Sequence, residues 1–265
     1  MAPRVALKAA RRNLVWHCGR MSPAASTDDR GVPMQVRQAF DNIREDLRRY
    51  GFAAAAHDVG WRAVNKVVDL RVLRAMTVRL QDVPDPRFFD AQGLEARFVD
   101  EDELARFAAA GTYELSTEFL REARARGDRC YALFDGEALA AYGWYSGLPS
   151  PIDEHFLLHF DPRFVYMYKG YTATAYRGRR LHAVGMCRAL RAFTEEGRKG
   201  LISWVYSNNF ASLQSVARMG YRTFGNVYLL RAGAHSFAHA TRGCGAYGFR
   251  VEPLSARGAL NPVGA

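Results

Sequence analysis

The order of elements in residues 164–221 decides the fold of this chain. The stretch opens with FVYMYKGY at 164–171, continues through YRGRRLH at 176–182, and reaches LISWVY at 201–206 before it closes with MGY. The β-branched and aromatic opening favours a strand, and Gly170 near its end permits a bulge or a close backbone approach. The pattern predicts a strand, a basic turn, a helix, a second strand and a second helix.

The basic turn leads into a long helix predicted over residues 179–197. The first amides of a helix have no partner inside it, and the helix dipole places partial positive charge at the same end. A phosphate fits such an end. The turn around Gly178 therefore predicts an anion site.

With the Asn pair at 208–209 and the closing Gly-aromatic, this order resembles the GCN5-related N-acetyltransferase (GNAT) superfamily over about residues 95–231. The resemblance implies an α/β (α+β) fold with a mixed, mostly antiparallel central sheet, splayed middle strands and flanking helices. It also implies that acetyl-CoA or another acyl-CoA binds against the splayed strands as a co-substrate. The acyl group would then pass to an amine by direct attack.

The resemblance places donor-binding residues at the end of the central strand, in the turn and after the second strand. They are Tyr171, Thr172, Arg177, Gly178, Arg179, Arg180, Leu181, His182 and Asn209. Arg180 and His182 stand where the family has small residues, so we expect arginine side chains to bind the phosphates. The alternative is that CoA binds weakly. Asn209 either bonds the pantetheine chain or caps the next helix.

The catalytic candidates are less specific. The family commonly has a general acid, Tyr, seven residues after the Asn, and here that position is Val216. Ser212 and Ser207 are the candidates that could donate a proton to the leaving thiolate, and Tyr168 on the central strand is a candidate for removing the proton of the amine. A structural aromatic and a helix cap are the competing interpretations of these residues.

An acidic pair provides the candidate for amine recognition or deprotonation. Glu114 and Glu118 are four residues apart, so on a helix they face the same way. A solvated acidic face explains the same spacing. His182 titrates near neutrality, but its place after the turn fits a phosphate or helix-end contact better than a base.

The residues before the deciding stretch predict the family's other elements. We expect a strand at 95–99, helices at 101–109 and 116–126, and a hairpin of strands at 130–134 and 138–145. Ser116 is a plausible N-cap, and the Asp-Gly pair between the hairpin strands is a strong turn signal. Asp153, Glu154, His155 and His159 precede the central strand in a loop that could border the acceptor, without the spacing of a metal site.

The charge of the chain is concentrated near its start. The net charge is +10, and residues 1–80 hold 15 Lys or Arg against 7 Asp or Glu. This asymmetry directs any weak contact with a membrane surface or an acidic protein to residues 35–80. Nucleic acid is disfavoured, because only four of the 37 basic residues are Lys and coding bias explains much of the Arg excess.

Pattern changes divide the chain into four parts. Residues 1–34 lack the apolar core of a secretory signal, so they read as a disordered leader; the alternative is a start codon assigned too early, with Met21 or Met34 as the true start. Residues 35–82 read as an amphipathic helical extension, with one helix at 35–50 and a second at 52–80. This extension either packs on the catalytic part or lies on a membrane surface. The GNAT-like part covers 95–231, and residues 232–265 read as an irregular tail.

The cysteines and the hydropathy bear on the compartment. Cys18, Cys130, Cys187 and Cys244 form no CxxC or Cys-His pair, and no run of 18 apolar residues occurs. We expect a cytoplasmic protein without a metal. The leading hypothesis is an acyl-CoA-dependent N-acyltransferase, most simply an acetyltransferase, acting on a small amine such as an amino sugar, amino acid or polyamine.

Two other hypotheses remain open. The first keeps the fold but takes the acyl group from an acyl carrier protein or an aminoacyl-tRNA, because the small residues of the phosphate turn are missing. The second is a degenerate binding module without catalysis that docks through residues 35–80.

Overall fold

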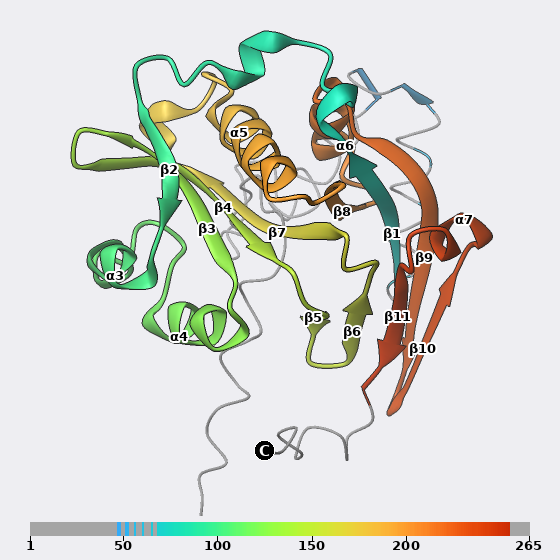
Figure 1. Cartoon of the computed structure of the whole chain (residues 1–265). Helices are drawn as coiled ribbons and strands as arrows, with labels where there is room; N and C mark the ends of the chain where they lie inside the picture. Colours follow the sequence, from blue (N-terminus) through green and yellow to red (C-terminus); the bar gives the residue numbers. More distant parts are fainter. Residues whose placement is uncertain are drawn as a thin grey trace, which may run out of the picture.

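The computed structural model describes residues 47–48, 51–52, 56, 60, 65 and 68–254. The predicted leader and most of the predicted helical extension lie outside these residues. The described part consists of one large sheet, one small sheet and helices on both faces of the large sheet (Figure 1).

The large sheet is mostly antiparallel. Its strand order is β10-β9-β1-β8-β7-β4-β3-β2, and only the central pair β7–β8 is parallel. The strands are β1 (Asp69–Val78), β2 (Glu95–Val99), β3 (Arg129–Asp135), β4 (Ala138–Ser146), β7 (Phe164–Thr172), β8 (Gly200–Tyr206), β9 (Arg222–Ala232) and β10 (His235–Ala240). The predicted mixed α/β class is therefore confirmed.

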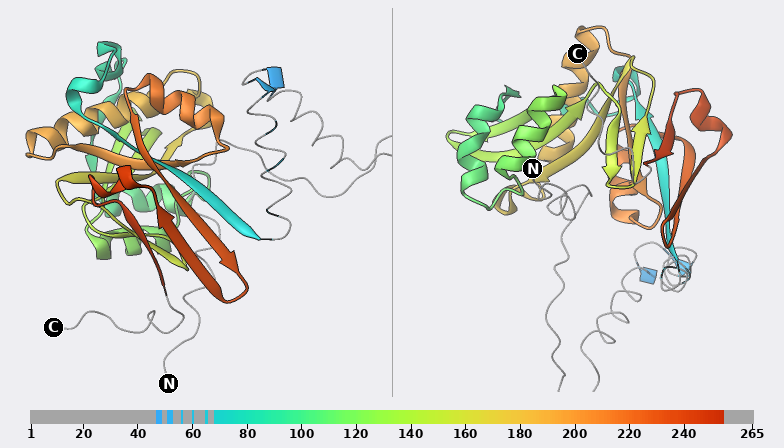
Figure 2. Two further views of the ribbon diagram at one scale, coloured as in Figure 1. Left: turned by 90° about the vertical axis from the view of Figure 1, so that its right-hand side faces the viewer. Right: turned by 90° about the horizontal axis from the view of Figure 1, so that it is seen from below.

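The helices form two groups on opposite faces of this sheet (Figure 2). On one face lie α5 (Leu181–Glu195) and α6 (Phe210–Arg218), which pack in a core with Met76 and Val165. On the other face lie α3 (Glu101–Ala109) and α4 (Thr117–Arg126). That face also carries α7 (Arg242–Gly245) and the small sheet of β5 (Ser150–Asp153), β6 (Phe156–His159) and β11 (Arg250–Pro253).

The two central strands pair only at their beginnings. The register joins Phe164, Val165 and Tyr166 of β7 to Gly200, Leu201 and Ile202 of β8. Beyond these pairs β7 keeps only its β4 partner, and β8 keeps only its β1 partner. The carboxyl-terminal halves of β7 and β8 therefore separate, which confirms the predicted splay.

A β-bulge interrupts β7 just after its last pair with β8. Trp144 of β4 lies opposite Lys169, and Tyr145 lies opposite Met167, so Tyr168 is the extra residue. Tyr168 and Lys169 consequently both reach the α4 side, where each contacts the ring of Phe119. Gly170 is left facing α5.

The local signals for the first helices and the hairpin are confirmed. The side chain of Ser116 accepts a hydrogen bond from the amide of Phe119 and caps α4, which ends at Gly127 in the left-handed region. Gly136, with a φ of +57°, turns β3 into β4. These elements form where the sequence predicts them because their caps and turns act locally.

The prediction of a helix over residues 52–80 is wrong for the part that the structure describes continuously. Asp69–Val78 is a strand between β8 and β9 in the middle of the sheet. Its carboxyl-terminal half is buried on both faces, so it lacks the alternation of a half-exposed strand. Its apolar residues Val72 and Met76 are four apart and fit a helical period equally well.

The predicted irregular tail is also wrong as far as residue 254. The chain continues from β9 through β10, α7 and β11, so the described fold extends from residue 69 to 253 and not only from 95 to 231. Gly225 of β9 allows α7 to pack closely against this strand, because a Cβ at position 225 would lie 2.5 Å from the Sγ atom of the buried Cys244. Such contacts leave no periodic signal in a sequence.

Three cysteines lie in the described part: Cys130, Cys187 and Cys244 are buried free thiols. Among the described residues, no helix combines the length and the apolar character needed to cross a membrane.

Candidate active site

A cavity of about 370 Å³ lies where β7 and β8 separate. Its wall combines the end of β7, the following turn, the start of α5, one side of α6 and a single residue from the loop before α4. The lining residues are Glu114, Gly170, Tyr171, Thr172, Tyr176, Arg177, Gly178, Arg180, Leu181, His182, Ala211, Ser212 and Ser215. The volume falls within the range of small-molecule sites.

The predicted phosphate turn forms one side of this cavity. Gly178 adopts a φ of +84°, which a residue with a side chain rarely takes. The next turn residue on the wall, Arg180, is the N-cap of α5 and makes no side-chain cap. The first amides of α5 therefore lack both an intrahelical acceptor and a capping side chain. They are suited to an anion from outside.

Arg180 stands in a strained position. Its φ of +61° lies in the left-handed region, at a cost of about 1 kcal/mol for a residue other than glycine. Glycine there would remove this cost, because it has no Cβ, whereas arginine adds a cation to the wall. Strain of this kind is commonly found where function requires the side chain.

His182 and Gly170 fit together at the floor of the cavity. A Cβ on Gly170 would lie 2.3 Å from Cε1 and 2.7 Å from Nδ1 of the His182 ring. The predicted close approach at Gly170 is thus confirmed, and the approaching group is an imidazole. Burial lowers the pKa of His182 to about 4, so the expectation that it titrates near neutrality is wrong.

A second cavity of about 450 Å³ adjoins the first. The two share Arg180, His182 and Ser215, and the second adds Asp85, Phe88, Ala183, Arg218 and Met219. Apart from Ser212, the sequence reasoning missed the α6 residues on these walls. The relevant signal is helical spacing, because residues 211, 215 and 218 share one side of this helix.

Seven of the nine predicted donor-binding residues line the first cavity, and Arg179 and Asn209 do not. The guanidinium of Arg179 lies over the Tyr176 ring at 5.6 Å from its centroid, and the residue is half-buried. The Asn209 side chain accepts a hydrogen bond from the Ser212 amide at 3.1 Å. The capping interpretation of Asn209 is therefore the one that the structure supports.

The two serine candidates for the leaving-group proton differ in their surroundings, and so does the position where the family has its tyrosine. Ser212 lines the first cavity, and its hydroxyl makes no hydrogen bond to the described residues. The Ser207 hydroxyl is buried and also lacks a hydrogen-bond partner among them, but it does not reach the cavity wall. Val216 is buried in the core under α6. Ser212 remains the best placed of these groups.

Tyr168 is not part of the cavity. Its hydroxyl donates to Oδ2 of Asp128 at 2.9 Å, and the same carboxylate pairs with Arg126 at 2.7 Å. Burial and then the Asp128 charge hold the pKa of Tyr168 well above its ordinary value. The structural interpretation fits this residue, and we withdraw the catalytic assignment.

The expectation that Glu114 and Glu118 share a helical face is wrong. Helix α4 begins at Thr117, so Glu114 lies before it, with a left-handed φ of +53°. Glu118 is on the helix, pairs with Arg121 and lies outside both cavities. Glu114 lines the first cavity and makes no hydrogen bond or ion pair with any residue that the structure describes.

Aromatic residues hold the loop that carries Glu114. The Tyr171 hydroxyl donates to the carbonyl of Thr112 at 3.0 Å, and the Tyr142 hydroxyl donates to the carbonyl of Tyr113 at 2.7 Å. The two tyrosine rings stack with centroids 5.4 Å apart. The loop before α4 is thereby attached to β4 and β7, beside the opening of the sheet.

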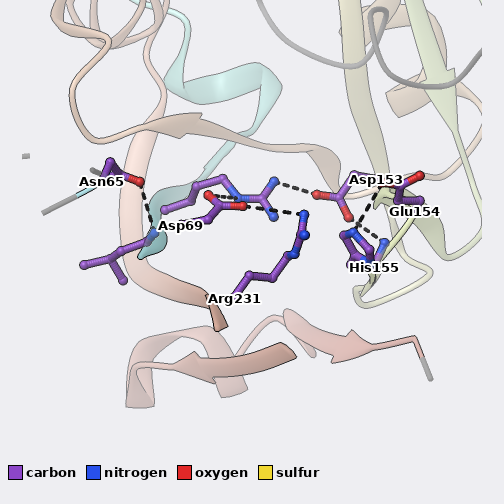
Figure 3. Close-up of polar contacts among 8 residues, drawn as sticks. Asn65, Asp69, Asp153, Glu154, His155 and Arg231 are labelled. Atoms are coloured by element: carbon purple, nitrogen blue, oxygen red, sulfur yellow. Dashed lines mark hydrogen bonds and ion pairs between the residues drawn. The ribbon is translucent and has the colours of Figure 1, made fainter. Parts of the chain in front are cut away.

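The acidic and histidine residues at 153–159 lie elsewhere. Asp153 pairs with Arg71 of β1 at 2.6 Å, and Glu154 pairs with the His155 ring at 3.3 Å (Figure 3). The same close-up shows Asp69 near Arg231, at 3.9 Å. These contacts connect β1, β9 and the β5–β6 hairpin. Within the described ranges, no three His, Cys, Asp or Glu residues are grouped to hold a metal.

Comparison with known proteins gives structural likenesses at low identity. No family model matches the chain. No curated protein matches it either. Solved structures that it resembles include a GNAT-family acetyltransferase from Colwellia psychrerythraea, with 13% identity over 64% of this chain and a TM-score of 0.44. A GCN5-related N-acetyltransferase from Kribbella flavida has 19% identity over 76% of this chain and a TM-score of 0.41.

A third such structure, a GCN5-related N-acetyltransferase from Sphaerobacter thermophilus, has 13% identity over 72% of this chain and a TM-score of 0.44. The match covers 76% of the Kribbella chain, but 59% of the Colwellia chain and 57% of the Sphaerobacter chain, both less than two thirds. Likenesses of this degree do not establish an activity.

Proposed function

We propose that this chain is an acyl-CoA-dependent N-acyltransferase of the GNAT type, most simply an acetyltransferase. One observation carries the proposal: the cavity at the splayed ends of β7 and β8 is walled by a basic, glycine-containing turn and an uncapped helix start. Amides and cations converge there, which is the chemistry that a pyrophosphate requires.

The residues fit a CoA donor. Gly178 and the first amides of α5 would meet the pyrophosphate, with Arg177 and Arg180 beside it. The second cavity adds Arg218 next to Arg180, a cationic surrounding for a further phosphate. This second cavity supports CoA over a carrier-protein donor, because a carrier-bound pantetheine has only one phosphate.

The chemistry is a direct transfer. The neutral amine attacks the thioester carbonyl, a C–N bond forms, the C–S bond breaks, and the thiolate leaves with a proton from Ser212 or water. The unpaired edge of β7 is suited to polarise the carbonyl through backbone amides. The proton of the acceptor ammonium passes to water or to a base that the cavity admits.

Isothermal calorimetry with acetyl-CoA tests the donor site. We expect saturable binding that weakens about tenfold in Arg180→Gly, which corresponds to about 1.4 kcal/mol and relieves the left-handed backbone at the same time. Arg179→Ala is the matched control, because that arginine belongs to the same turn and lies outside both cavities. Equal affinities of the wild type and Arg180→Gly, or no binding at all, would reject the proposed donor site.

A further inference from the structure

Lys169 is a buried cation in the stretch of β7 that has lost its β8 partner. The bulge at Tyr168 turns it toward α4, where its ammonium lies over the Phe119 ring at 5.2 Å from the centroid. The residue keeps only 7% of its surface exposed. Residues 68–254 contain two lysines, of which Lys169 is buried and Lys199 is exposed.

Among the described residues, this ammonium has no anionic partner at contact distance. Lys169 makes no hydrogen bond and no ion pair with any of them, and its ammonium lies over the Phe119 ring. A buried unpaired charge is costly, and proteins normally pair it. Burial lowers the pKa of Lys169, and the Glu114 charge opposes that shift. Lys169 is therefore a largely buried charge that no described residue pairs.

A second unpaired donor lies beside it. Trp144 faces Lys169 across the β4–β7 pair and is fully buried, and its indole Nε1 has no hydrogen-bond partner in the described part of the chain. Its ring meets the Phe119 ring edge-on, with centroids 5.0 Å apart. The Lys169 ammonium and the Trp144 indole N–H are thus two donors without a described acceptor, and both side chains contact the Phe119 ring.

Glu114 provides the opposite charge on the neighbouring cavity wall. Its carboxylate is exposed and makes no ion pair among the described residues, and its backbone is held at a φ of +53°. Its loop is attached to β7 two residues beyond Lys169, because the Tyr171 hydroxyl donates to the Thr112 carbonyl at 3.0 Å, and its charge raises the pKa of Lys169 against the effect of burial. An acid and a base that do not pair with each other, beside one opening in a sheet, present two charges to a ligand.

We propose that Glu114 and Lys169 recognise an acceptor that carries both an amine and a carboxylate, such as an amino acid, with Glu114 holding the ammonium end and Lys169 the carboxylate. The inference rests on the proposed function, because the acceptor amine must reach an acyl thioester at the same opening. It narrows the acceptor class. A polyamine would bring only positive charge to Lys169, and an amino sugar has no anion for it.

In the transfer step, an acyl-CoA is the co-reactant that supplies the acyl group. The acceptor ammonium loses a proton to water, its nitrogen forms a C–N bond to the acyl carbon, and the C–S bond to CoA breaks. The free thiol and the N-acyl amino acid are the products. In the product the amine has lost its charge, so its attraction to Glu114 falls while its carboxylate still fits Lys169.

The test compares amino acids with their carboxamides, which have the same amine but no carboxylate. Full-length protein is supplied with acetyl-CoA and the twenty L-amino acids, their amides, glucosamine or spermidine, and release of free thiol is measured. We expect at least one amino acid to be used, with kcat/KM at least tenfold above that of its amide. Glucosamine or spermidine as the best substrate would overturn the proposal.

Variants assign the preference to the two residues. Lys169→Met should reduce the ratio of acid to amide to within about twofold of one and leave the amide rate nearly unchanged. Lys169→Gln serves if the methionine variant does not fold. Glu114→Gln should lower kcat/KM for both compounds. Lys199→Met and Glu122→Gln are matched controls at exposed positions outside both cavities, and neither should alter the ratio.

Failure of the acceptor class and failure of the donor site give different results. If acetyl-CoA binds but no amino acid is acylated, or if Lys169→Met keeps the wild-type ratio, the acceptor assignment is rejected and the donor site stands. If acetyl-CoA does not bind, N-acetyl amino acids and their amides are compared as ligands by thermal shift. Carboxylate-specific stabilisation that disappears in Lys169→Met supports the proposal, and its absence in the wild type rejects it.

Discussion

Lys169 and Gly170 are neighbours on β7, yet they belong to two regions of different chemistry. The region on the α5 side of Gly170 consists of backbone amides, a glycine turn and arginines at a cavity wall. The region on the α4 side of Lys169 consists of aromatic rings around a buried ammonium, with Glu114 at its edge. Successive strand residues point to opposite faces, so one strand serves both regions.

These two chemistries suit the recognition of different ligands. A phosphate can be held by amides and solvent-accessible cations, which bury no charge before the ligand arrives. Selection of a small zwitterion requires charges at fixed positions with little water, and such charges destabilise the empty protein. The α4 side should therefore show a conflict between stability and function that the α5 side lacks.

The largest expected effect concerns the packing on the α5 side. In Gly170→Ala the new methyl would lie 2.3 Å from Cε1 of His182, so the ring or the strand must move. We expect a loss of about 2–3 kcal/mol in the free energy of unfolding, together with weaker acetyl-CoA binding. Urea unfolding measures the first effect and calorimetry the second.

The double variant Gly170→Ala/His182→Ala is the control, because it removes the ring that the methyl meets. It should recover part of the stability lost in the single Gly170→Ala variant, measured against His182→Ala. An unchanged urea midpoint in Gly170→Ala would show that the two regions are not separated by a tight contact at this position.

The second prediction concerns acid stability and also belongs to the α5 side. The pKa of His182 is about 4 in the folded protein and about 6.5 when unfolded, so between these values the unfolded state binds more protons. Stability is present above pH 6.5 and is lost as the pH falls toward 4. We expect wild type to lose about 2 kcal/mol more than His182→Gln across this window, because solvent in the adjoining cavities reduces the full effect.

Unfolding in urea at a series of pH values checks this difference. Parallel profiles for the wild type and His182→Gln would show that the imidazole is hydrated in the folded protein, and the contrast with the buried charge on the α4 side would disappear.

The smallest expected effect has the opposite sign and tests the α4 side. Lys169→Met should raise stability by about 1 kcal/mol at pH 7, because it removes a buried unpaired charge and retains an unbranched chain. The pKa of Lys169 is lowered in the folded state, so wild-type stability rises as the pH increases toward the ordinary value of 10.5. The gain of Lys169→Met should shrink over that range.

Thermal unfolding of Lys169→Met and of the exposed control Lys199→Met measures this gain. A Lys169→Met variant that is less stable than the wild type at pH 7 would mean that the ammonium already has a favourable environment, and the conflict inferred for the α4 side would be absent.

Much of the candidate site could be predicted from local sequence signals. The turn with Gly178, the helix after it and the capping Asn209 are specified within a few residues of one another, and seven predicted donor-binding residues do line one cavity. Residues that function through distant neighbours were missed or misassigned. Tyr168 reads as a strand aromatic with a reactive hydroxyl, and only its bond to Asp128, forty positions earlier, explains it.

The order of strand, basic turn, helix and strand after residue 164 is predictable without the structure, because helix capping, turn geometry and β-propensity act over a few neighbouring residues. The place of Asp69–Val78 as a central strand depends on tertiary packing, since its last four residues are buried on both faces and so lack the alternation that marks a strand. Tertiary packing also decides which face Lys169 takes, because a single bulge at Tyr168 reverses the alternation, and the bulge follows from pairing with β4 rather than from β7 alone.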